Sequence, residues 1–273
     1  MIPVGNTVPI LGRFLSTAAL RVPRLVVESA WLEHGPFAAW LIEATRPALL
    51  VELGVHNGYS YAAFCEAVIL AGLYTRCVGI DTWTGDEHSG FYGEDVLDRL
   101  RAHHDPIYAT FSTLLRSTFA DAVGRFADGS IDLLHIDGRH RYKDVVEDFS
   151  MWRPKLSTRA IVLFHDTEVQ ERDFGVHRFW RELSRDHKHF NFEHGNGLGV
   201  LAAGAEIPPA IAPLFDLSAS DGAAVRALYG RLGAAIALIF QWQQTRKALD
   251  EANVRIGNLR QSMIATNIAA TKR

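Results

Sequence analysis

Between residues 48 and 203, short runs of apolar and β-branched residues alternate with longer stretches of amphipathic helical pattern. Such an alternation is typical of βαβ units, whose parallel strands form one sheet with helices on both faces. The predicted strands are Ala48–Leu53, Cys77–Asp81, Thr113–Arg116, Ile131–Ile136 and Ala160–His165. The predicted helices between and after them are Tyr61–Ala71, Glu94–His103, Phe119–Arg125, Tyr142–Trp152 and Gly175–Asp186. The pattern therefore predicts an α/β fold with a doubly wound, mostly parallel sheet.

Two further strand-like runs, Asn191–Glu193 and Leu198–Ala203, follow these units and are separated by His194-Gly195-Asn196-Gly197. The glycines can supply the positive φ angles that a tight turn requires. The two runs are therefore predicted to form a hairpin, which brings the expected sheet to seven strands.

Changes in this pattern predict three segments. Residues 1–45 are expected to form a helical segment that lids the sheet or its ligand crevice, and residues 46–205 the α/β domain. Residues 206–273 are expected to form a helical extension, because Pro208, Pro209 and Pro213 interrupt regular structure at the boundary.

Apolar residues recur at heptad-like spacing in the extension. They are Trp242, Leu249, Ala252, Ile256, Leu259 and Met263. This spacing favours a coiled-coil seam and hence a homo-oligomer, but it lasts only about three heptads and includes an alanine. A helix packed on its own domain explains it equally well, and a helix leading to another domain of a longer chain is a third interpretation.

The composition excludes several classes of partner. The net charge of −3 provides no general attraction to nucleic acid or anionic lipid, and only two cysteines occur, which favours a reducing compartment. The N-terminus lacks the pattern of a secretory signal. The apolar run Leu232–Phe240 is far shorter than the ~20 residues of a membrane span. We therefore expect a cytoplasmic protein that neither binds nucleic acid nor spans a membrane.

A glycine-containing turn follows the first predicted strand, in the stretch Val51–Ser60. Gly54 and Gly58 allow the backbone to approach a ligand, and the helix that begins there can hold an anionic group with its amides. The pattern is E-x-G-x-x-x-G and not the G-x-G-x-x-G of dinucleotide enzymes, so it does not predict a pyrophosphate site. By itself it also fits an ordinary tight turn.

A second feature stands at the end of the second strand, where Asp81 lies about 25 residues beyond the first glycine, a spacing at which an acid commonly binds ribose hydroxyls. Together the two features resemble class I S-adenosylmethionine-dependent methyltransferases. The resemblance implies that Glu52 and Gly54 lie near the methionine end of the cofactor and Asp81 near its ribose. It places Ser117 near the adenine, although a lone serine also fits a turn or a helix cap. The other residues expected around the cofactor are Asn57, Gly58, Tyr59, Ser60, Thr82 and Asp137.

Polar side chains also follow the fourth and fifth strands. Asp137 and His140 come after the fourth, and His165 and Asp166 end the fifth. Because parallel strands end at the same edge of a sheet, these groups are expected to converge there. The structural alternative is that His140 caps the next helix and Asp137 holds the turn at Gly138.

The stretch I-D-G-x-H-x-Y, followed by D-x-x-x-W and H-D-T, resembles methyltransferases found with sugar- and polysaccharide-tailoring genes, including metal-dependent macrolide-sugar O-methyltransferases. The resemblance implies that Asp137 and Asp166 hold a divalent cation and that His140 is the general base. His165 stands where those enzymes carry a carboxylate. As a third ligand it would favour manganese over magnesium, which prefers hard oxygens.

The long connection after the second strand contains W-x-G-D-x-H-x-G-x-Y-G, a stretch that recurs in the related sugar-tailoring proteins. The resemblance implies that Asp86, His88 and Tyr92 face the acceptor. Asp173, before a later helix, is expected on another wall of the same pocket. An ordinary surface loop remains the alternative.

The sequence thus predicts an S-adenosylmethionine-dependent O-methyltransferase, assisted by Mg²⁺ or Mn²⁺, that acts on a sugar hydroxyl of a glycan or a glycosylated small molecule. A metal hydrolase is an alternative, because His135, Asp137, His140 and the pair His165-Asp166 can be drawn as a zinc site. That interpretation leaves Glu52 and Asp81 unexplained. A non-catalytic scaffold that retains the fold is a third alternative.

Overall fold

A computed structural model describes residues 10–87, 90–171 and 173–271, with side chains described as far as residue 261. It divides the chain into two units, Met1–Ile236 and Ala237–Arg273. The sheet, the cavity and all the residues of the candidate site lie in the first unit.

The first unit is built on a seven-stranded sheet of order β5-β2-β1-β6-β7-β9-β8, which confirms the predicted fold class. The strands are β1 (Leu49–Leu53), β2 (Arg76–Asp81), β5 (Ser112–Arg116), β6 (Ile131–Ile136), β7 (Leu156–His165), β8 (His189–Phe192) and β9 (Leu198–Ala202). The pairs among β5, β2, β1, β6 and β7 are parallel, whereas β9 runs antiparallel to both β7 and β8. The sheet is therefore mixed, with the predicted hairpin at one edge.

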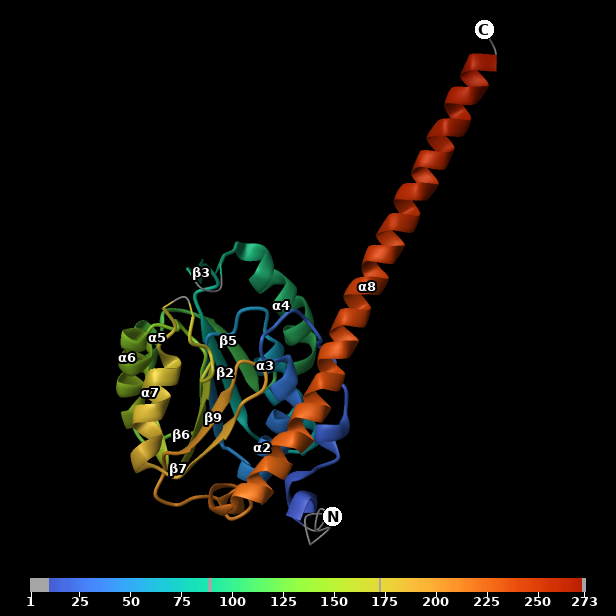
Figure 1. The fold of residues 1–273 in the computed structure, drawn as a ribbon. Coiled ribbons are helices and arrows are strands. Elements are labelled where there is room, and N and C mark those ends of the chain that lie inside the picture. Colours follow the sequence, from blue (N-terminus) through green and yellow to red (C-terminus); the bar gives the residue numbers. More distant parts are fainter. Residues whose placement is uncertain (1–9, 88–89, 172, 272–273) are drawn as a thin grey trace, which may run out of the picture. The chain divides into compact units, whose positions relative to one another are not determined.

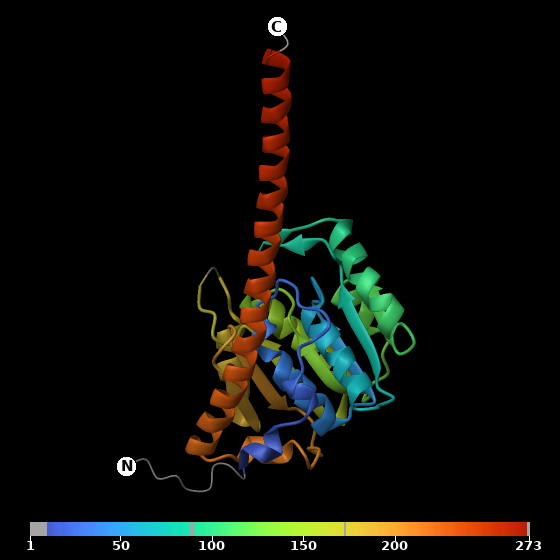
Figure 2. The same ribbon diagram turned by 90° about the vertical axis from the view of Figure 1, so that its right-hand side faces the viewer.

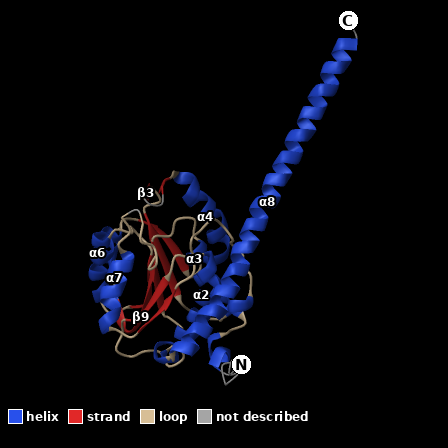
Figure 3. Ribbon diagram, viewed as in Figure 1, coloured by secondary structure: helices blue, strands red, loops and turns tan. Residues whose placement is uncertain are grey.

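Helices cover both faces of this sheet, whose strands are red in Figure 3. The α-helices of the chain are α2 (Gly35–Thr45), α3 (Tyr59–Leu70), α4 (Glu94–Tyr108), α5 (Phe119–Val123), α6 (Tyr142–Trp152), α7 (Val176–Leu183) and α8 (Ala219–Thr271). The 3-10 helices are η1 (Gly12–Phe14), η2 (Ala18–Leu20), η3 (Leu32–His34), η4 (Arg153–Lys155), η5 (Ser184–Asp186) and η6 (Ala212–Asp216). Figures 1 and 2 show α5, α6 and α7 on one face and α2 and α3 on the other.

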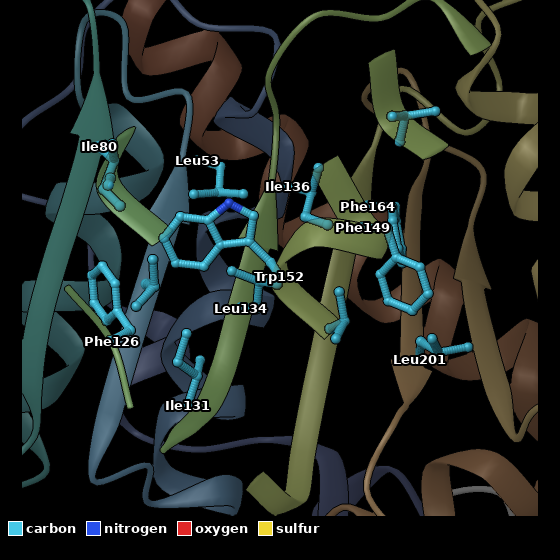
Figure 4. Packing of buried hydrophobic residues seen from close by; sticks show 14 of the residues in the cluster. Leu53, Ile80, Phe126, Ile131, Leu134, Ile136, Phe149, Trp152, Phe164 and Leu201 are labelled. Carbon is cyan, nitrogen blue, oxygen red and sulfur yellow. The ribbon is translucent and has the colours of Figure 1, made fainter. Parts of the chain in front are cut away.

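The core between the sheet and the α5–α7 layer is built around Trp152, whose indole is fully buried. Figure 4 shows it lying over Leu53, Leu134 and Ile136, which come from the central strands β1 and β6. Both faces of these strands are covered, so their residues read as continuous apolar runs. The same central strands end at the ligand crevice, so this core fixes the rim of the site.

Three details of the sheet region differ from the sequence-based prediction. Helix α4 continues beyond His103 through Pro106, although proline removes one helical hydrogen bond, because His104 is buried and its Nε2 lies 2.7 Å from Ser112 Oγ. Strand β7 begins at Leu156 rather than Ala160. The connection after β2 contains a short hairpin of β3 (Gly85–Asp86) and β4 (Gly90–Phe91), which was not predicted.

The predicted N-terminal segment belongs to the first unit and is anchored in it by buried aromatic side chains. Phe14, Trp31 and Phe37 are all almost fully buried. Residues 28–31 reach the crevice at the ends of the strands and line it. This segment thus contributes directly to the candidate site.

Helix α8 begins within the first unit, where Val225, Tyr229 and Ile236 are buried. Among the described residues, the stretch Ala219–Gln261 is long and apolar enough to cross a membrane by length and composition, with a mean hydropathy of 1.5 over its most apolar window, of which 22% is buried. The sequence-based prediction missed this because it considered only the uninterrupted run Leu232–Phe240. The absence of a membrane span stays a prediction.

Candidate functional site

A cavity of about 620 Å³ lies at the carboxyl ends of β1, β2, β6 and β7. Strand β1 pairs with β2 on one side and with β6 on the other, so the chain reverses direction across the sheet at this point. Ligands of open α/β sheets bind at such a switch point. The volume falls within the range of about 300–1,000 Å³ that is typical of small-molecule sites.

Two glycines shape the wall of this cavity after β1. Gly54 has a φ of +91° and Gly58 a φ of +82°, values that L side chains rarely adopt. A Cβ atom at Gly54 would also collide with the carbonyl oxygen of Asp137. The close approach of the β1 and β6 ends therefore requires glycine at position 54.

The carboxylate of Asp81 holds the same turn in place. Its Oδ2 accepts hydrogen bonds from the amides of Val55 (2.8 Å) and His56 (2.9 Å), and its Oδ1 accepts one from Trp83 (2.7 Å). Asp81 also lines the cavity. The residue predicted to bind ribose is thus a structural link between the loops after β1 and β2, a role that spacing alone did not reveal.

The structure separates the predicted cofactor residues into two groups. Those that line the cavity are Gly54, Asn57, Gly58, Ser60, Asp81, Thr82 and Asp137. Glu52, Tyr59 and Ser117 are not in the lining. Thr118, the residue after Ser117, lines the cavity instead. The hydroxyl of Tyr59 donates instead to the carbonyl of Leu32.

Glu52 is fully buried and contacts the cavity-lining residue Ser60. Ser60 Oγ donates to its Oε1 (2.7 Å), and His135 Nδ1 lies 3.3 Å from its Oε2. Burial raises the pKa of Glu52, although His135 and Ser60 act in the opposite direction. Glu52 therefore supports Ser60, which itself lines the cavity.

Asp137, His140, His165 and Asp166 meet at one side of the cavity, as their positions after β6 and β7 predicted. His140 Nε2 lies 2.9 Å from Asp166 Oδ2 and 3.7 Å from Asp137 Oδ1. His165 Nδ1 lies 3.3 Å from Asp137 Oδ1 and 3.4 Å from Asp166 Oδ1. The four side chains form an alternating set of imidazoles and carboxylates.

Three members of this set have the geometry of a cation site. Ligand atoms of Asp137, His140 and Asp166 lie within 4.8 Å of one another. Among the described residues, His165 is not part of this group, although the sequence predicted it as a ligand and His140 only as a base. The oxygens and the nitrogen offered here suit magnesium less well than manganese.

The carboxylates strongly affect the two imidazoles. Burial lowers the pKa of His140, but hydrogen bonds to and the charges of Asp137 and Asp166 outweigh it and raise the pKa to about 9. For His165 burial is likewise outweighed by the same two carboxylates, so its pKa lies well above the usual value. Burial opposes ionisation of Asp166, yet His165 and His140 hold its pKa below the usual range.

Without a cation, His140 is therefore protonated at neutral pH. An imidazole with the ordinary pKa of about 6.5 would instead be mostly neutral at this pH. A cation on Asp137 and Asp166 would compete with His140 for these carboxylates and so lower its pKa. Cation binding and the availability of His140 as a base are thus coupled.

This arrangement predicts a pH dependence of stability. Because the folded pKa of His140 is raised from 6.5 to about 9, its contribution is fully present below pH 6.5 and is lost as the pH rises through about 9. The side chain is 14% exposed, and the shift corresponds to about 3 kcal/mol. We expect urea unfolding of the cation-free protein to lose stability of this order between pH 6 and 10. In His140→Gln the loss should be smaller, with His165 still contributing because its pKa is raised as well, and equal losses in both proteins would contradict the assigned pKa.

The predicted acceptor residues are only partly brought together. Asp86 and Tyr92 line the cavity, and the Tyr92 ring stacks on His56 with 4.8 Å between centroids. Asp173 is not in the lining and lies 3.4 Å from Arg141 Nε. His88 lies outside the described residues.

Several cavity residues were not among the predicted site residues. Phe174 stacks on the His140 ring with centroids 4.6 Å apart, and Asn196 donates from Nδ2 to Asp166 Oδ1 (3.0 Å). Glu28 and Trp31 enter the lining from the N-terminal segment. The D-F-G run before α7 and the turn in the hairpin were visible signals for the first two, whereas no motif marked the others.

Comparisons with known proteins find similarity over part of this chain. A sequence model of the family described as a methyltransferase domain matches residues 51–167. The uncharacterized protein y4gI of Sinorhizobium fredii is 54% identical over 186 residues, which make up 68% of this chain and 20% of the relative. The chain thus spans about a fifth of the length of that curated relative.

Solved structures resemble the chain at lower identity. A methyltransferase from Geobacter sulfurreducens is 21% identical with a TM-score of 0.47, over 64% of this chain and 80% of that one. The O-methyltransferase TomG from Streptomyces achromogenes, solved with S-adenosylmethionine and involved in tomaymycin synthesis, is 15% identical with a TM-score of 0.47. That alignment covers 71% of this chain and 98% of TomG.

Proposed function

We propose that this chain, whose residues 51–167 match a family model described as a methyltransferase domain, is a class I S-adenosylmethionine-dependent methyltransferase that methylates a sugar hydroxyl with the help of a divalent cation. The observation that carries the proposal is the shared cavity. The turn Gly54–Gly58 and Asp81 form one part of its wall, and the Asp137, His140 and Asp166 cluster forms another.

The charge of the cavity supports a cationic cofactor and a metal ion. Acidic side chains dominate the lining, namely Glu28, Asp81, Asp86, Asp137, Asp144, Glu147, Asp148 and Asp166. Arg139 lines the same cavity, and His140 and His165 are paired with two of these acids. Bound S-adenosylmethionine would supply a methyl group on a positively charged sulfur, which such a lining favours electrostatically.

The cluster also fits a divalent cation. Asp137 and Asp166 would hold it through oxygens, and Nε2 of His140, 2.9 Å from Asp166 Oδ2, would lie beside it as a base and not as a ligand. A cation there would stabilise the negative charge that develops on the acceptor oxygen. The residues of the chain align this oxygen with the methyl group, and such alignment can supply a large part of the rate acceleration.

His140 is the residue we propose to accept the hydroxyl proton. The turn after β6 places His140 at the cavity, and stacking on Phe174 holds the orientation of its ring. A sugar hydroxyl ionises far above neutral pH, so it needs a base in the transition state. With its carboxylates bound to a cation, the ring can be neutral and accept through Nε2.

A sugar acceptor is supported by aromatic and polar groups that line the cavity, among them Asp86, Tyr92 and Phe174. Flat apolar faces beside carboxylates suit the alternating C–H and O–H groups of a sugar ring. The hydrolase alternative explains the cluster but gives no role to the turn Gly54–Gly58. The scaffold alternative predicts cofactor binding without turnover.

The proposal is tested by incubating the protein with S-adenosylmethionine labelled in its methyl group, Mn²⁺ and a panel of glycosides. Mass spectrometry of the products should show label on a sugar oxygen. Cofactor binding without transfer to any hydroxyl compound of the panel would favour the scaffold, and cleavage of a glycoside or ester without label would favour the hydrolase.

We also propose that the second unit mediates self-association. Leu238, Trp242, Leu249, Ile256 and Leu259 of α8 are each at least 48% exposed and lie at heptad-like spacing. Ending the chain after Phe240 keeps the buried residues Val225, Tyr229 and Ile236. We expect this truncation to lower the number of chains per particle, measured by light scattering, without changing cofactor affinity. An unchanged number of chains per particle would exclude the seam.

A further inference from the structure

The turn His194–Gly197 between β8 and β9 touches the cation cluster from outside the matched residues 51–167. The Gly195 carbonyl oxygen lies 3.0 Å from His165 Nε2, and Asn196 Nδ2 donates to Asp166 Oδ1 (3.0 Å). One short turn thus contacts Asp166 of the cluster and His165, which faces its two carboxylates.

The contact at Gly195 keeps a proton on Nε2 of His165. A carbonyl oxygen can only accept, so His165 Nε2 must donate to it. The other nitrogen, Nδ1, then faces Asp137 and Asp166, from which it is 3.3 and 3.4 Å away. The turn therefore keeps a proton on Nε2 and sets the orientation of the ring.

The contact at Asn196 fixes Asp166. Asp166 has a φ of +59° and Asn196 a φ of +66°, so both backbones adopt the left-handed conformation that asparagine and aspartate tolerate best. The Asn196 carbonyl also accepts from the amide of Glu168 (2.9 Å). Side chain and backbone of Asn196 together tie the turn to the end of β7.

His34 also holds the turn, through the same Gly195 carbonyl oxygen that His165 contacts. It is fully buried, and its Nε2 lies 2.9 Å from the same Gly195 oxygen. Its ring contacts the rings of His165 and His194, with centroids 5.6 and 4.9 Å apart. Burial, with His165 and His194 nearby, keeps the pKa of His34 well below the usual value, so the ring is a neutral donor.

We propose that the turn His194–Gly197, held by His34, is a positioning element for the cation site: Gly195 orients His165 and Asn196 orients Asp166. This inference rests on the proposed cation-assisted function. Groups that orient metal ligands in this way typically contribute 10–100-fold to metal affinity. The N-terminal segment would thus act on the site through a hydrogen bond and not only as a lid.

The test compares Mn²⁺ affinity, measured by calorimetry on the full chain, with the affinity for S-adenosylhomocysteine. Asn196→Gly removes the amide and suits the positive φ at this position. His34→Leu removes the donor at similar volume, whereas His34→Gln restores an N–H donor. Asn191→Gly is the matched control, because the Asn191 amide bonds to Thr167 and Glu168 and not to the cluster.

We expect Asn196→Gly and His34→Leu to weaken Mn²⁺ binding by about 10–100-fold. His34→Gln and Asn191→Gly should stay within a few-fold of wild type, and all four should bind S-adenosylhomocysteine normally. Wild-type Mn²⁺ affinity in both Asn196→Gly and His34→Leu would overturn the positioning role alone. Failure of wild type itself to bind Mn²⁺, with normal cofactor affinity, would overturn the cation-assisted mechanism and this inference with it.

Discussion

Replacing His140 by alanine is expected to lower kcat by about 10²–10⁴-fold, the range usual for a lost general base, while S-adenosylmethionine affinity is retained. The reason is that the acceptor hydroxyl must then lose its proton without help as the methyl–oxygen bond forms. His140 reaches the cluster through Nε2, 2.9 Å from Asp166 Oδ2. The effect should therefore fall on kcat and not on cofactor binding.

The measurement is steady-state kinetics with a competent acceptor, combined with calorimetry of the cofactor. His189→Ala is a suitable control, since this histidine is exposed on β8 and does not line the cavity. A kcat within a few-fold of wild type in His140→Ala would remove the base assignment. Loss of cofactor affinity would instead show that the residue supports the binding wall.

Replacing Asp166 by asparagine is expected to abolish stimulation by Mg²⁺ or Mn²⁺. Asparagine keeps the volume and tolerates the φ of +59° at this position, so the variant removes the charge without the backbone strain that alanine would add. The wild type should be inhibited by a chelator and recover when Mn²⁺ is restored. His165→Asp, which restores a hard oxygen, should tighten Mg²⁺ binding.

The outcome that would contradict this account is activity that is indifferent to chelator and survives both His140→Ala and Asp166→Asn. The cluster would then be structural, and alignment of acceptor and cofactor alone would carry the reaction. Asp81→Ala provides a comparison, because it should reduce activity by weakening cofactor binding while leaving the response to metal unchanged.

The sheet and the convergence of the four cluster residues could be predicted from sequence for one reason. In a parallel sheet, consecutive strands β6 and β7 end at the same edge, so polar residues just after them must meet. The strands themselves were visible because burial on both faces leaves continuous apolar runs. Local pattern and topology thus determine this part of the site.

Other features depend on contacts between distant parts of the chain. His34 reaches the Gly195 carbonyl across 161 residues, and although the glycines predicted the turn, no motif predicts this contact. The carboxylate of Asp81 accepts hydrogen bonds from three backbone amides, and these bonds depend on the exact path of two turns. The raised pKa of His140 arises from distances to two carboxylates that sequence spacing does not supply.

The central claim, that the cavity at the ends of β1, β2 and β6 binds S-adenosylmethionine, is tested most directly by calorimetric titration with S-adenosylhomocysteine. The account predicts binding of one molecule per chain. In Asp81→Ala the affinity should fall at least about tenfold, because a lost hydrogen bond to a charged group costs roughly 1.5–3 kcal/mol. Absence of heat with either S-adenosyl compound, together with clear binding of NAD, would contradict the assignment.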